Sequence, residues 1–139
     1  MTLRMDIEAL HAFMHEAFPQ VAADFRVERL DEEGLVVRFV VDDRHLRPGG
    51  TVSGPTIFAL ADVAIYLAVL SRIGPVALAV TTNCSIDFLR KPQAGCDLIA
   101  QARLLKLGRS LAVGDVLVFS DGQPAPVARA ALTYSLPPA

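Results

Sequence analysis

The sequence has few cysteines, and their spacing suits neither a disulfide framework nor a zinc site. Among its 139 residues, cysteine occurs twice, as Cys84 and Cys96. Small domains that depend on disulfides carry more cysteines, and structural zinc sites use closely spaced pairs of them. We therefore predict a reduced, cytoplasmic protein that folds without a disulfide or a bound metal.

The sequence also lacks the charge excess and the long apolar segments that nucleic acids and membranes require. Thirteen basic residues against fifteen acidic ones give a formal net charge of -2, whereas a phosphate backbone selects a basic surface. The N-terminal segment does not read as a secretion signal. The longest apolar run, Pro55 to Ser71, is shorter than the ~20 residues of a membrane span and contains Asp62. We expect no nucleic-acid partner and no membrane, and a helix buried in protein.

Apolar residues are abundant for a chain of this length. They make up 53% of the sequence, and the mean hydropathy is +0.42. A chain of this size forms one domain with a sizeable core, so we expect a single domain over residues 1–139. The high hydropathy favours apolar surface that is hidden between subunits of an oligomer.

Hydrophobic spacing predicts a helix, a hairpin and a second, longer helix in the first half of the chain. Apolar residues three and four apart indicate a helix over residues 6–18. Two alternating runs, 25–30 and 35–41, flank a turn of charged residues and glycine and indicate a hairpin. A loop rich in glycine and proline then leads into the long apolar helix. Gly54 and Pro55 suit the N-cap and the first turn of that helix.

Four extended runs follow the long helix, over residues 76–89, 98–107, 111–120 and 127–136. The order helix, two strands, helix, four strands predicts an α+β fold. In that fold an antiparallel sheet wraps around the central hydrophobic helix. The core is expected over about residues 24–136, with the N-terminal helix as an addition to it.

Two residues of the central helix are candidates for catalysis. Asp62 is an acid in an apolar helix, where a carboxylate is costly to bury without a function or a partner such as Arg72. Gly54 begins the helix, where free N–H groups can stabilise an oxyanion, although an ordinary helix start with Ser53 or Gly54 as its cap fits as well. Eight residues of helix separate the two by roughly 12 Å. A shared site would therefore combine Asp62 of one subunit with Gly54 of another.

The strand that follows the central helix carries a row of polar side chains. Thr81, Asn83, Ser85 and Asp87 alternate with mostly apolar residues. Thr81 or Asn83 could orient a water molecule, and Asn83 is also a candidate contact to the substrate. Ser85 and Asp87 fit a sheet surface that faces solvent.

Basic residues stand at two loop positions where they could contact phosphate groups. Arg90 and Lys91 follow the polar strand, and Arg109 and Ser110 occupy a turn after Gly108. Cationic side chains and turn hydroxyls on loops commonly bind phosphate. These four residues are therefore candidates for substrate binding.

The histidines give weaker signals. His11 and His15 lie one helical turn apart, but no third ligand is evident, so we expect no metal site. His45 lies in the loop before the central helix. It could act as a general base, or it could be a solvated loop residue.

Three segments of the chain resemble a known family. They read VSGPTIFALAD, TTNCSIDFLRKPQAG and KLGRSLAVGDV. The chain resembles hotdog-fold acyl-CoA thioesterases of the phenylacetic-acid-degradation (PaaI) type, over about residues 24–134. In that family a His-Gly-Gly opens the central helix, and an acid follows eight residues after the first glycine. Gly54 and Asp62 keep that register.

The resemblance implies thioester hydrolysis at the interface of a homodimer, which can pair further into a homotetramer. It assigns Asp62 as nucleophile or as base for water, the Gly54 N–H as donor to the carbonyl, and Thr81 as an assisting hydroxyl. It also implies that Arg90, Lys91 and Arg109 contact coenzyme A. No cofactor is implied, since coenzyme A is part of the substrate.

The sequence departs from the family pattern at three positions. Ser53 stands in place of the motif histidine, and Pro55 in place of the second glycine. Arg47 stands where an asparagine or glutamine often contacts the site. Ser53 could hydrogen-bond nearby backbone, whereas Arg47 could engage an anionic acyl group, engage the attacking water, or point to solvent.

Two other functions fit the same residues. The loss of the motif histidine suits an acyl-CoA binder without catalytic activity. A hotdog enoyl-CoA hydratase or dehydratase would need a histidine beside its acid, and His45 is the candidate for that role. The sequence leaves the acyl group open.

Overall fold

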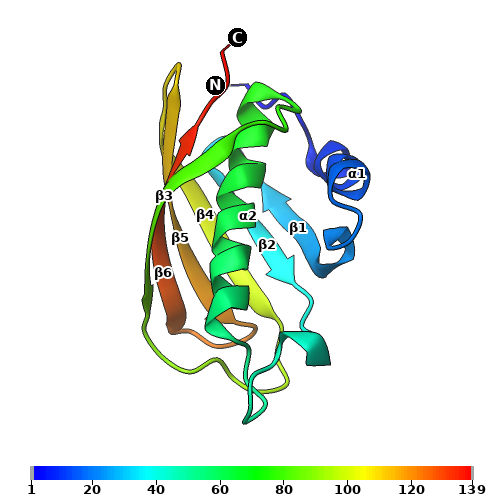
Figure 1. The fold of residues 1–139 in the computed structure, drawn as a ribbon, viewed down its shortest axis with the longest axis vertical. Helices are drawn as coiled ribbons and strands as arrows, with labels where there is room; N and C mark the ends of the chain where they lie inside the picture. The colour runs from blue at the N-terminus through cyan, green and yellow to red at the C-terminus, as the bar shows by residue number, and fades with distance from the viewer. Residues whose placement is uncertain (1, 139) are drawn as a thin grey trace.

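An antiparallel sheet wrapped around one long helix forms the protein in the computed structural model, which describes residues 2–138 (Figure 1). The elements in chain order are α1 (Ile7–Ala17), η1 (Ala22–Asp24), β1 (Phe25–Leu30), β2 (Gly34–Phe39), η2 (Asp43–His45), α2 (Gly54–Ile73), β3 (Val80–Phe88), β4 (Leu98–Leu107), β5 (Leu111–Ser120) and β6 (Pro126–Ser135). The two η elements are short 3-10 helices. The predicted α+β class and the order of the main helices and strands are confirmed.

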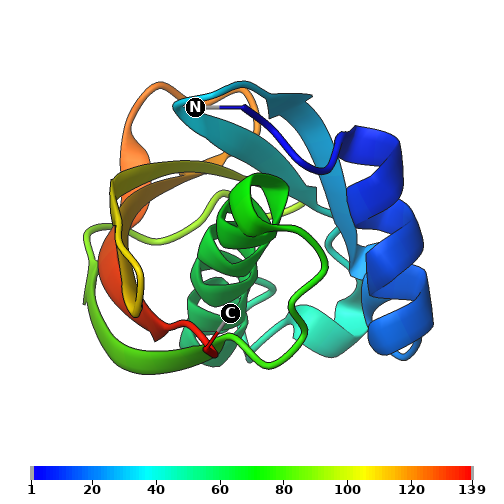
Figure 2. The ribbon, with the colours of Figure 1, turned by 90° about the horizontal axis from the view of Figure 1, so that it is seen from above.

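The six strands form one sheet in the order β1-β2-β4-β5-β6-β3, and every neighbouring pair is antiparallel. Seen from above, the sheet curves around α2, while α1 lies outside this wrap beside β1 (Figure 2). β1 and β3 are the two edge strands. The edge strand β3 carries Thr81 and Asn83, two of the predicted site residues.

The core lies between α2 and the concave face of the sheet. Leu60, Ala61, Ala64 and Ile65 of α2 are completely buried. Gly114 of β5 allows the close approach, because a Cβ at this position would lie 2.6 Å from Ile65 Cδ1. The long apolar run is thus a core helix, as predicted. By length and composition alone α2 could cross a membrane, but 61% of its apolar window is buried in the protein.

Of the two residues predicted as possible caps of α2, Ser53 and Gly54, the structure has the first. Ser53, not Gly54, is the N-cap, since its hydroxyl accepts a hydrogen bond from Thr56 N at 3.3 Å. A glycine has no side chain for that bond. Gly54 is therefore the first helical residue, with Pro55 behind it. The helix ends at Gly74, whose φ of 96° suits a residue without a Cβ.

β3 begins four residues later than predicted. Residues 76–79 form a turn, in which Ala79 N donates to the Val76 carbonyl at 3.2 Å. The other predicted strand bounds agree with the structure to within two residues. The hairpin of β1 and β2 is confirmed, with register pairs from Phe25–Phe39 to Leu30–Leu35.

β3 contains a bulge that changes which side chains face inward. Thr81 pairs with Tyr134 and Asn83 pairs with Thr133, so Thr82 is an extra residue without a register partner. Thr81 consequently shares the half-buried side of the strand with Cys84. Uninterrupted alternation had placed Thr81 on the same side as Asn83, and the bulge makes that prediction wrong.

α1 is joined to edge strand β1 by a histidine. Nε2 of His11 accepts a hydrogen bond from Val27 N at 2.9 Å. Partial burial, followed by the positive charges of His15 and Arg26, lowers the pKa of His11 below its ordinary value of 6.5. His11 is therefore neutral in the folded protein at neutral pH, as an acceptor at Nε2 must be.

We expect the free energy of unfolding to decrease as the pH falls below 6.5, the ordinary pKa of His11. In that range the unfolded chain binds a proton that the folded chain resists, so acid favours unfolding. The loss ends below the lowered pKa of the folded state, where both states are protonated. Urea unfolding at several pH values gives the free energy of unfolding as a function of pH. This free energy should change less with pH in His11→Gln than in the wild type. His15 lies on the exposed side of α1, so His15→Gln should keep most of the pH dependence of the free energy of unfolding. The same pH dependence in His11→Gln and in the wild type would contradict the prediction.

Candidate active site

Asp62 is held by two hydroxyl groups that come from different strands, β3 and β6. Its Oδ1 accepts a hydrogen bond from Thr81 Oγ1 at 2.6 Å and another from Tyr134 OH at 2.6 Å. The Tyr134 hydroxyl also lies 3.0 Å from the Asp62 carbonyl oxygen. Hydrogen bonds to a carboxylate are short and strong. The partners of the Asp62 carboxylate are therefore these two hydroxyls, which both donate to Oδ1.

Three elements bring these side chains together. Asp62 lies near the middle of α2, Thr81 precedes the bulge of β3, and Tyr134 lies near the end of β6. Thr81 and Tyr134 are register partners, so the bulge that turns Thr81 inward also sets it beside Tyr134. Asp62 and Thr81 were predicted, whereas Tyr134 was missed. Its signal was a polar hydroxyl on the core-facing side of a strand, where such a group needs a partner.

Burial keeps the hydroxyl and thiol groups around Asp62 protonated. Tyr134 is 2% exposed, and burial first, then its hydrogen bond to Asp62, raises the pKa of Tyr134 far above 10.0. Burial and the charge of Asp62 raise the pKa of Cys84 above 9.0. Tyr134 is thus a permanent donor, and Cys84 is a neutral thiol rather than a thiolate nucleophile. Both cysteines are free.

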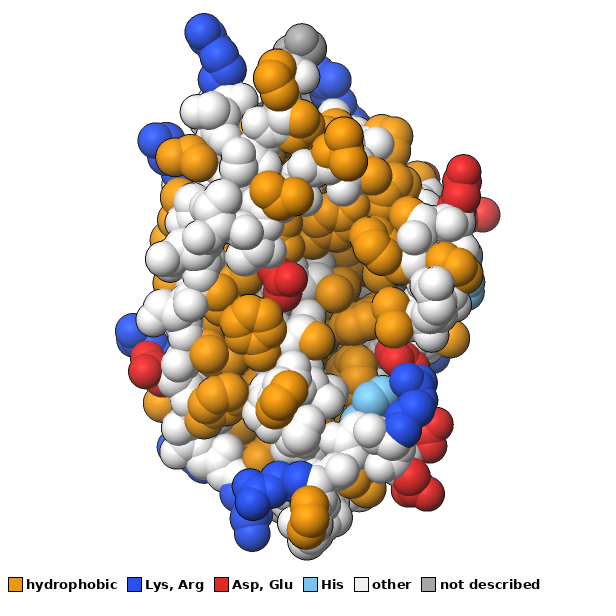
Figure 3. Space-filling model, viewed as in Figure 1, with side chains coloured by type: hydrophobic (Ala, Val, Ile, Leu, Met, Phe, Trp, Pro, Cys, Tyr) orange, Lys and Arg blue, Asp and Glu red, His pale blue; other side chains and the backbone are white. Residues whose placement is uncertain are grey.

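The surface around the site is apolar. The face that carries α2 and β3 shows an isolated acidic side chain at its centre, beside a depression bordered by hydrophobic side chains (Figure 3). Asp62 is the acid of α2 and is half-buried. Phe58 of α2 is 38% exposed and Phe88 of β3 is 54% exposed. A carboxylate in such surroundings is accessible to a ligand with an apolar part.

The start of α2 presents the second candidate group. The Gly54 N–H opens the helix and makes no hydrogen bond with any residue between 2 and 138. Phe88 lies over this position, since a Cβ on Gly54 would lie 3.4 Å from its Cζ. The Ser53 hydroxyl is engaged in the cap and lies 2.9 Å from Thr56 Oγ1. Gly54 therefore offers a donor, whereas Ser53 holds the helix start in shape.

Asn83 lies away from Asp62 within the chain. It is exposed on the outer side of β3, together with Ser85 and Asp87. Asp87 pairs there with Arg129, with an N–O distance of 3.0 Å. The solvent-facing prediction for Ser85 and Asp87 is confirmed, and Asn83 belongs to the same surface.

The basic candidates lie at different ends of the sheet. Arg90 and Lys91 are exposed after β3, where Arg90 donates to the Pro126 carbonyl. Arg109 and Ser110 are exposed in the turn between β4 and β5, at the opposite end of the sheet (Figure 1). One chain therefore does not bring the two positions to the same phosphate group.

Arg47 lies in the loop before α2. The loop is closed by a bridge between Leu46 and Val52, and Arg47 N donates to the Thr51 carbonyl at 2.8 Å. The Arg47 residue is exposed. Arg47 thus lies on an exposed surface loop, seven residues before α2 begins at Gly54.

His45 is not the solvated loop residue that was one of the two predictions. It is 8% exposed, and its ring packs 4.5 Å from the ring of Phe39. Nδ1 accepts a hydrogen bond from Asp42 N at 2.9 Å, and Nε2 lies 3.5 Å from a carboxylate oxygen of Asp24. Arg44 pairs with the other oxygen of Asp24. These contacts tie η2 to η1, just before the start of β1, and to the end of β2, which gives His45 a structural role.

No metal site is found within residues 2–138, where no group of three or more His, Cys, Asp or Glu side chains is placed to hold an ion. His11 is bound to the backbone of β1.

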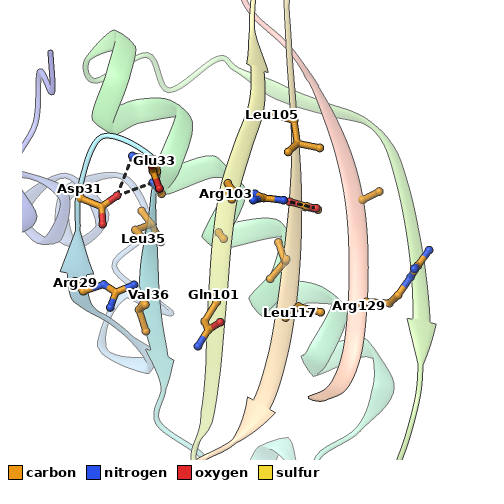
Figure 4. A pocket seen from close by; sticks show the side chains of 15 residues that line it. Arg29, Asp31, Glu33, Leu35, Val36, Gln101, Arg103, Leu105, Leu117 and Arg129 are labelled. Atoms are coloured by element: carbon orange, nitrogen blue, oxygen red, sulfur yellow. Dashed lines mark hydrogen bonds and ion pairs between the residues drawn. The ribbon is translucent and has the colours of Figure 1, made fainter. Parts of the chain in front are cut away.

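A groove of about 570 Å³ lies on the other face of the sheet. Its side chains come from β1, β2, β4, β5 and β6 and include Arg29, Arg103, Leu105 and Leu117 (Figure 4). Two of the acids there, Asp31 and Asp115, have partners. Asp31 accepts two backbone hydrogen bonds in its own turn, and Asp115 lies 3.7 Å from Arg103. The groove has no counterpart of the Asp62 cluster.

Comparisons with known proteins agree on one family. The family model described as the thioesterase superfamily matches residues 49–127. The acyl-coenzyme A thioesterase PaaI of Escherichia coli is 33% identical over 94 residues, which cover 68% of this chain and 65% of that protein. The chain spans 56% to 65% of the lengths of the curated relatives that it matches.

Solved structures give longer matches. A Silicibacter sp. TM1040 protein, named as an inferred thioesterase, is 56% identical and superposes with a TM-score of 0.93 over 99% of this chain and 96% of that one. A Streptococcus mutans protein with acetyl-CoA bound is 28% identical, with a TM-score of 0.71 over 82% of this chain and 89% of that one. The similarity thus includes both the complete fold and a protein that holds an acyl-CoA.

Proposed function

The chain belongs to the thioesterase superfamily, and from this membership we propose that it hydrolyses acyl-CoA thioesters to a free acid and coenzyme A. The predicted PaaI-type resemblance and hotdog fold are confirmed by the same matches. The observation that carries the proposal is the Asp62 carboxylate, which two hydroxyls hold on an apolar, ligand-accessible surface. A carboxylate so placed can activate water or attack a carbonyl carbon.

Asp62 can serve hydrolysis in two ways. As a general base it takes a proton from water, and the water oxygen bonds to the thioester carbonyl carbon. The carbon–sulfur bond then breaks, and the leaving thiolate of coenzyme A recovers the proton. As a nucleophile Asp62 bonds through a carboxylate oxygen to the carbonyl carbon and the carbon–sulfur bond breaks, which leaves an anhydride and the thiolate of coenzyme A. Water then hydrolyses the anhydride, and the proton that the water releases goes to the thiolate. Either route consumes one water and releases one acid and one thiol.

The Gly54 N–H is the proposed donor to the thioester oxygen. It lies at the positive end of α2 and makes no other hydrogen bond within residues 2–138. Negative charge develops on the carbonyl oxygen as the tetrahedral intermediate forms, and a fixed backbone donor stabilises it. Pro55 has no N–H, so Gly54 is the donor that this helix start supplies before Thr56.

A complete site needs two copies of the chain. Gly54 and Asp62 lie eight residues apart on the same helix, roughly 12 Å along its axis, which is too far for one carbonyl group. β3 leaves one backbone edge unpaired, and its end residues Val80 and Phe88 are each 54% exposed. An unpaired strand edge is a template for a second strand. We expect a homodimer joined at β3, and a homotetramer made from two such dimers.

Coenzyme A would then meet basic residues from both subunits. Arg90 and Lys91 lie at one end of the sheet, and Arg109 and Ser110 lie at the other, all of them exposed. The bound acetyl-CoA of the Streptococcus mutans relative supports an acyl-CoA ligand for this fold. Phosphates are bound by cationic groups on loops of this kind.

The test is the release of free thiol from a panel of acyl-CoAs with short, medium, aromatic and dicarboxylic acyl groups. We expect turnover of at least one class, because the carboxylate and the amide donor are both in place. Binding of several acyl-CoAs without turnover would contradict the proposal and indicate a binder without catalytic activity. Hydration of an enoyl-CoA that is lost in His45→Ala would indicate a hydratase, but the burial of His45 speaks against that role.

A further inference from the structure

We propose that Tyr134 is a positioning residue for Asp62: with Thr81 it occupies the Oδ1 atom and leaves the Oδ2 atom to meet water or the acyl group. This inference rests on the proposed hydrolysis and concerns how the carboxylate is aimed. No motif of the sequence singled out Tyr134. Its hydrogen bonds to Asp62 suggest the role.

Two donors on one oxygen restrict the carboxylate more than one donor could. Both hydroxyl oxygens lie 2.6 Å from Oδ1, and they come from different strands. A carboxylate with one oxygen fixed in two directions has its plane and its second oxygen fixed as well. Among residues 2–138, no hydrogen bond to Oδ2 is found. Oδ2 is therefore the oxygen that remains available to a reactant.

Tyr134 also links the side chain of Asp62 to the backbone of Asp62. The phenol oxygen lies 3.0 Å from the Asp62 carbonyl oxygen as well as 2.6 Å from Oδ1. One phenol therefore contacts both ends of the same residue, which ties the side-chain rotamer to the axis of α2. Thr81 makes only the side-chain contact.

Tyr134 is the more rigid of the two donors. It lies on β6, which has strand neighbours on both sides, and it is 2% exposed. Thr81 lies on edge strand β3, beside the bulge, and is half-buried. A side chain in a paired, buried strand has less freedom to move than one at a bulged edge. Tyr134 on β6 is therefore the donor that fixes the orientation of the Asp62 carboxylate.

Other aromatic rings hold the Tyr134 ring in place. Its centroid lies 6.1 Å from that of Tyr66, which in turn meets Phe18 edge-on at 5.8 Å. Phe13 of α1 packs against Tyr66 at 6.3 Å. Aromatic contacts at these separations stabilise the arrangement of the rings. The helix α1 thus supports the site from outside the sheet, although it contributes no hydrogen bond to Asp62.

A buried phenol that is merely satisfied by the nearest acceptor would behave differently from a positioning residue. Losing it would lower stability but leave the turnover of the remaining folded protein unchanged. If Tyr134 aims the carboxylate, its loss instead lowers kcat while substrate binding persists. The ratio of the effects on kcat and KM separates the two cases.

The test compares Tyr134→Phe with Tyr66→Phe, which removes the same atom from the neighbouring ring. The Tyr66 hydroxyl donates to the Ala77 carbonyl at 3.3 Å and not to Asp62. We expect Tyr134→Phe to lower kcat about tenfold or more, with KM within about twofold of the wild type. Tyr66→Phe should change kcat by less than about twofold. Thiol release on the best substrate of the panel is the measurement.

A second variant keeps the inference testable if Tyr134→Phe fails to fold. Thr81→Val leaves the phenol in place, so it should retain at least about ten times the kcat of Asp62→Asn. If Thr81→Val is as inactive as Asp62→Asn, Tyr134 is not the residue that orients the Asp62 carboxylate.

The outcomes for this inference and for the proposed function can be told apart. A folded Tyr134→Phe protein with unchanged kcat, in a wild type that hydrolyses thioesters and depends on Asp62, overturns the positioning role alone. A wild type that releases no thiol from any acyl-CoA overturns the proposed function, and the positioning role with it.

Discussion

Replacing Asp62 with asparagine is expected to lower kcat for thioester hydrolysis by roughly 10²- to 10⁴-fold. The amide can neither take a proton from water nor form an anhydride with the acyl group. Its oxygen can still accept the hydrogen bonds that Thr81 and Tyr134 donate to Oδ1. The variant therefore tests the chemistry of the carboxylate while the surrounding fold remains. Thiol release on the best acyl-CoA of the panel, measured over a range of concentrations, gives kcat and KM.

The matched control removes a carboxylate elsewhere on the sheet. Asp115 of β5 faces the outer groove, where it lies 3.7 Å from Arg103. Asp115→Asn should leave kcat within about twofold of the wild type, because this acid is exposed to solvent and its ion pair contributes little. Full activity in a folded Asp62→Asn protein would refute the assignment of Asp62.

Replacing Gly54 with proline is the second large effect we expect, a loss of roughly 10²- to 10³-fold in kcat. Proline removes the N–H that the proposed mechanism directs at the thioester oxygen. The backbone tolerates it, since Ser53 has φ -71° and ψ 153°, the region that a residue before proline prefers. The position is also the first of the helix, where proline is common.

Gly54→Ala is the control for this variant, because it adds a Cβ but keeps the N–H. The added carbon would lie 3.4 Å from Phe88 Cζ, which requires only a small shift. We expect a loss of a few-fold, from crowding of the substrate, compared with the much larger loss in Gly54→Pro. Equal losses in the two variants would show that space, and not the donor, matters at this position.

The two inactive variants together test the shared site. If Asp62 and Gly54 act from different subunits, a mixed dimer of Asp62→Asn and Gly54→Pro contains one intact site and one doubly altered site. Random mixing of equal amounts should then restore about a quarter of the wild-type activity. If both groups act from the same chain, mixing restores nothing. Unfolding and refolding the two variants together, followed by thiol release, is the measurement.

The sequence predicted the elements whose side chains repeat with a clear period. The amphipathic spacing of Ile7, Leu10 and Met14 predicted α1, and its observed bounds differ from the prediction by one residue at each end. The apolar run around Asp62 predicted α2, and the acid within it was the best candidate for catalysis. Periodicity and the cost of a buried charge are local properties, so a single sequence reveals them.

The rest of the site depends on long-range pairing that local patterns do not contain. Tyr134 is 72 residues from Asp62 in the sequence, and only the register of β6 with β3 brings it to that carboxylate. Strict alternation turned Thr81 to the wrong side, because nothing local marked the bulge at Thr82. The solvated-loop alternative for His45 is wrong, because long-range contacts with Phe39 and Asp24 bury its ring.

The bulge in β3 makes the inward position of Thr81 depend on the number of residues in the strand. After the bulge, the side chains of Cys84 and Ile86 point toward the core. Before the bulge, Thr81 points the same way because one extra residue lies between it and Asn83. A single-residue deletion at Thr82 would leave every one of these side chains in the protein and yet turn Thr81 outward. Insertions and deletions in β3, and not only substitutions at Thr81, are therefore changes by which related chains could gain or lose this hydroxyl while they keep the same fold.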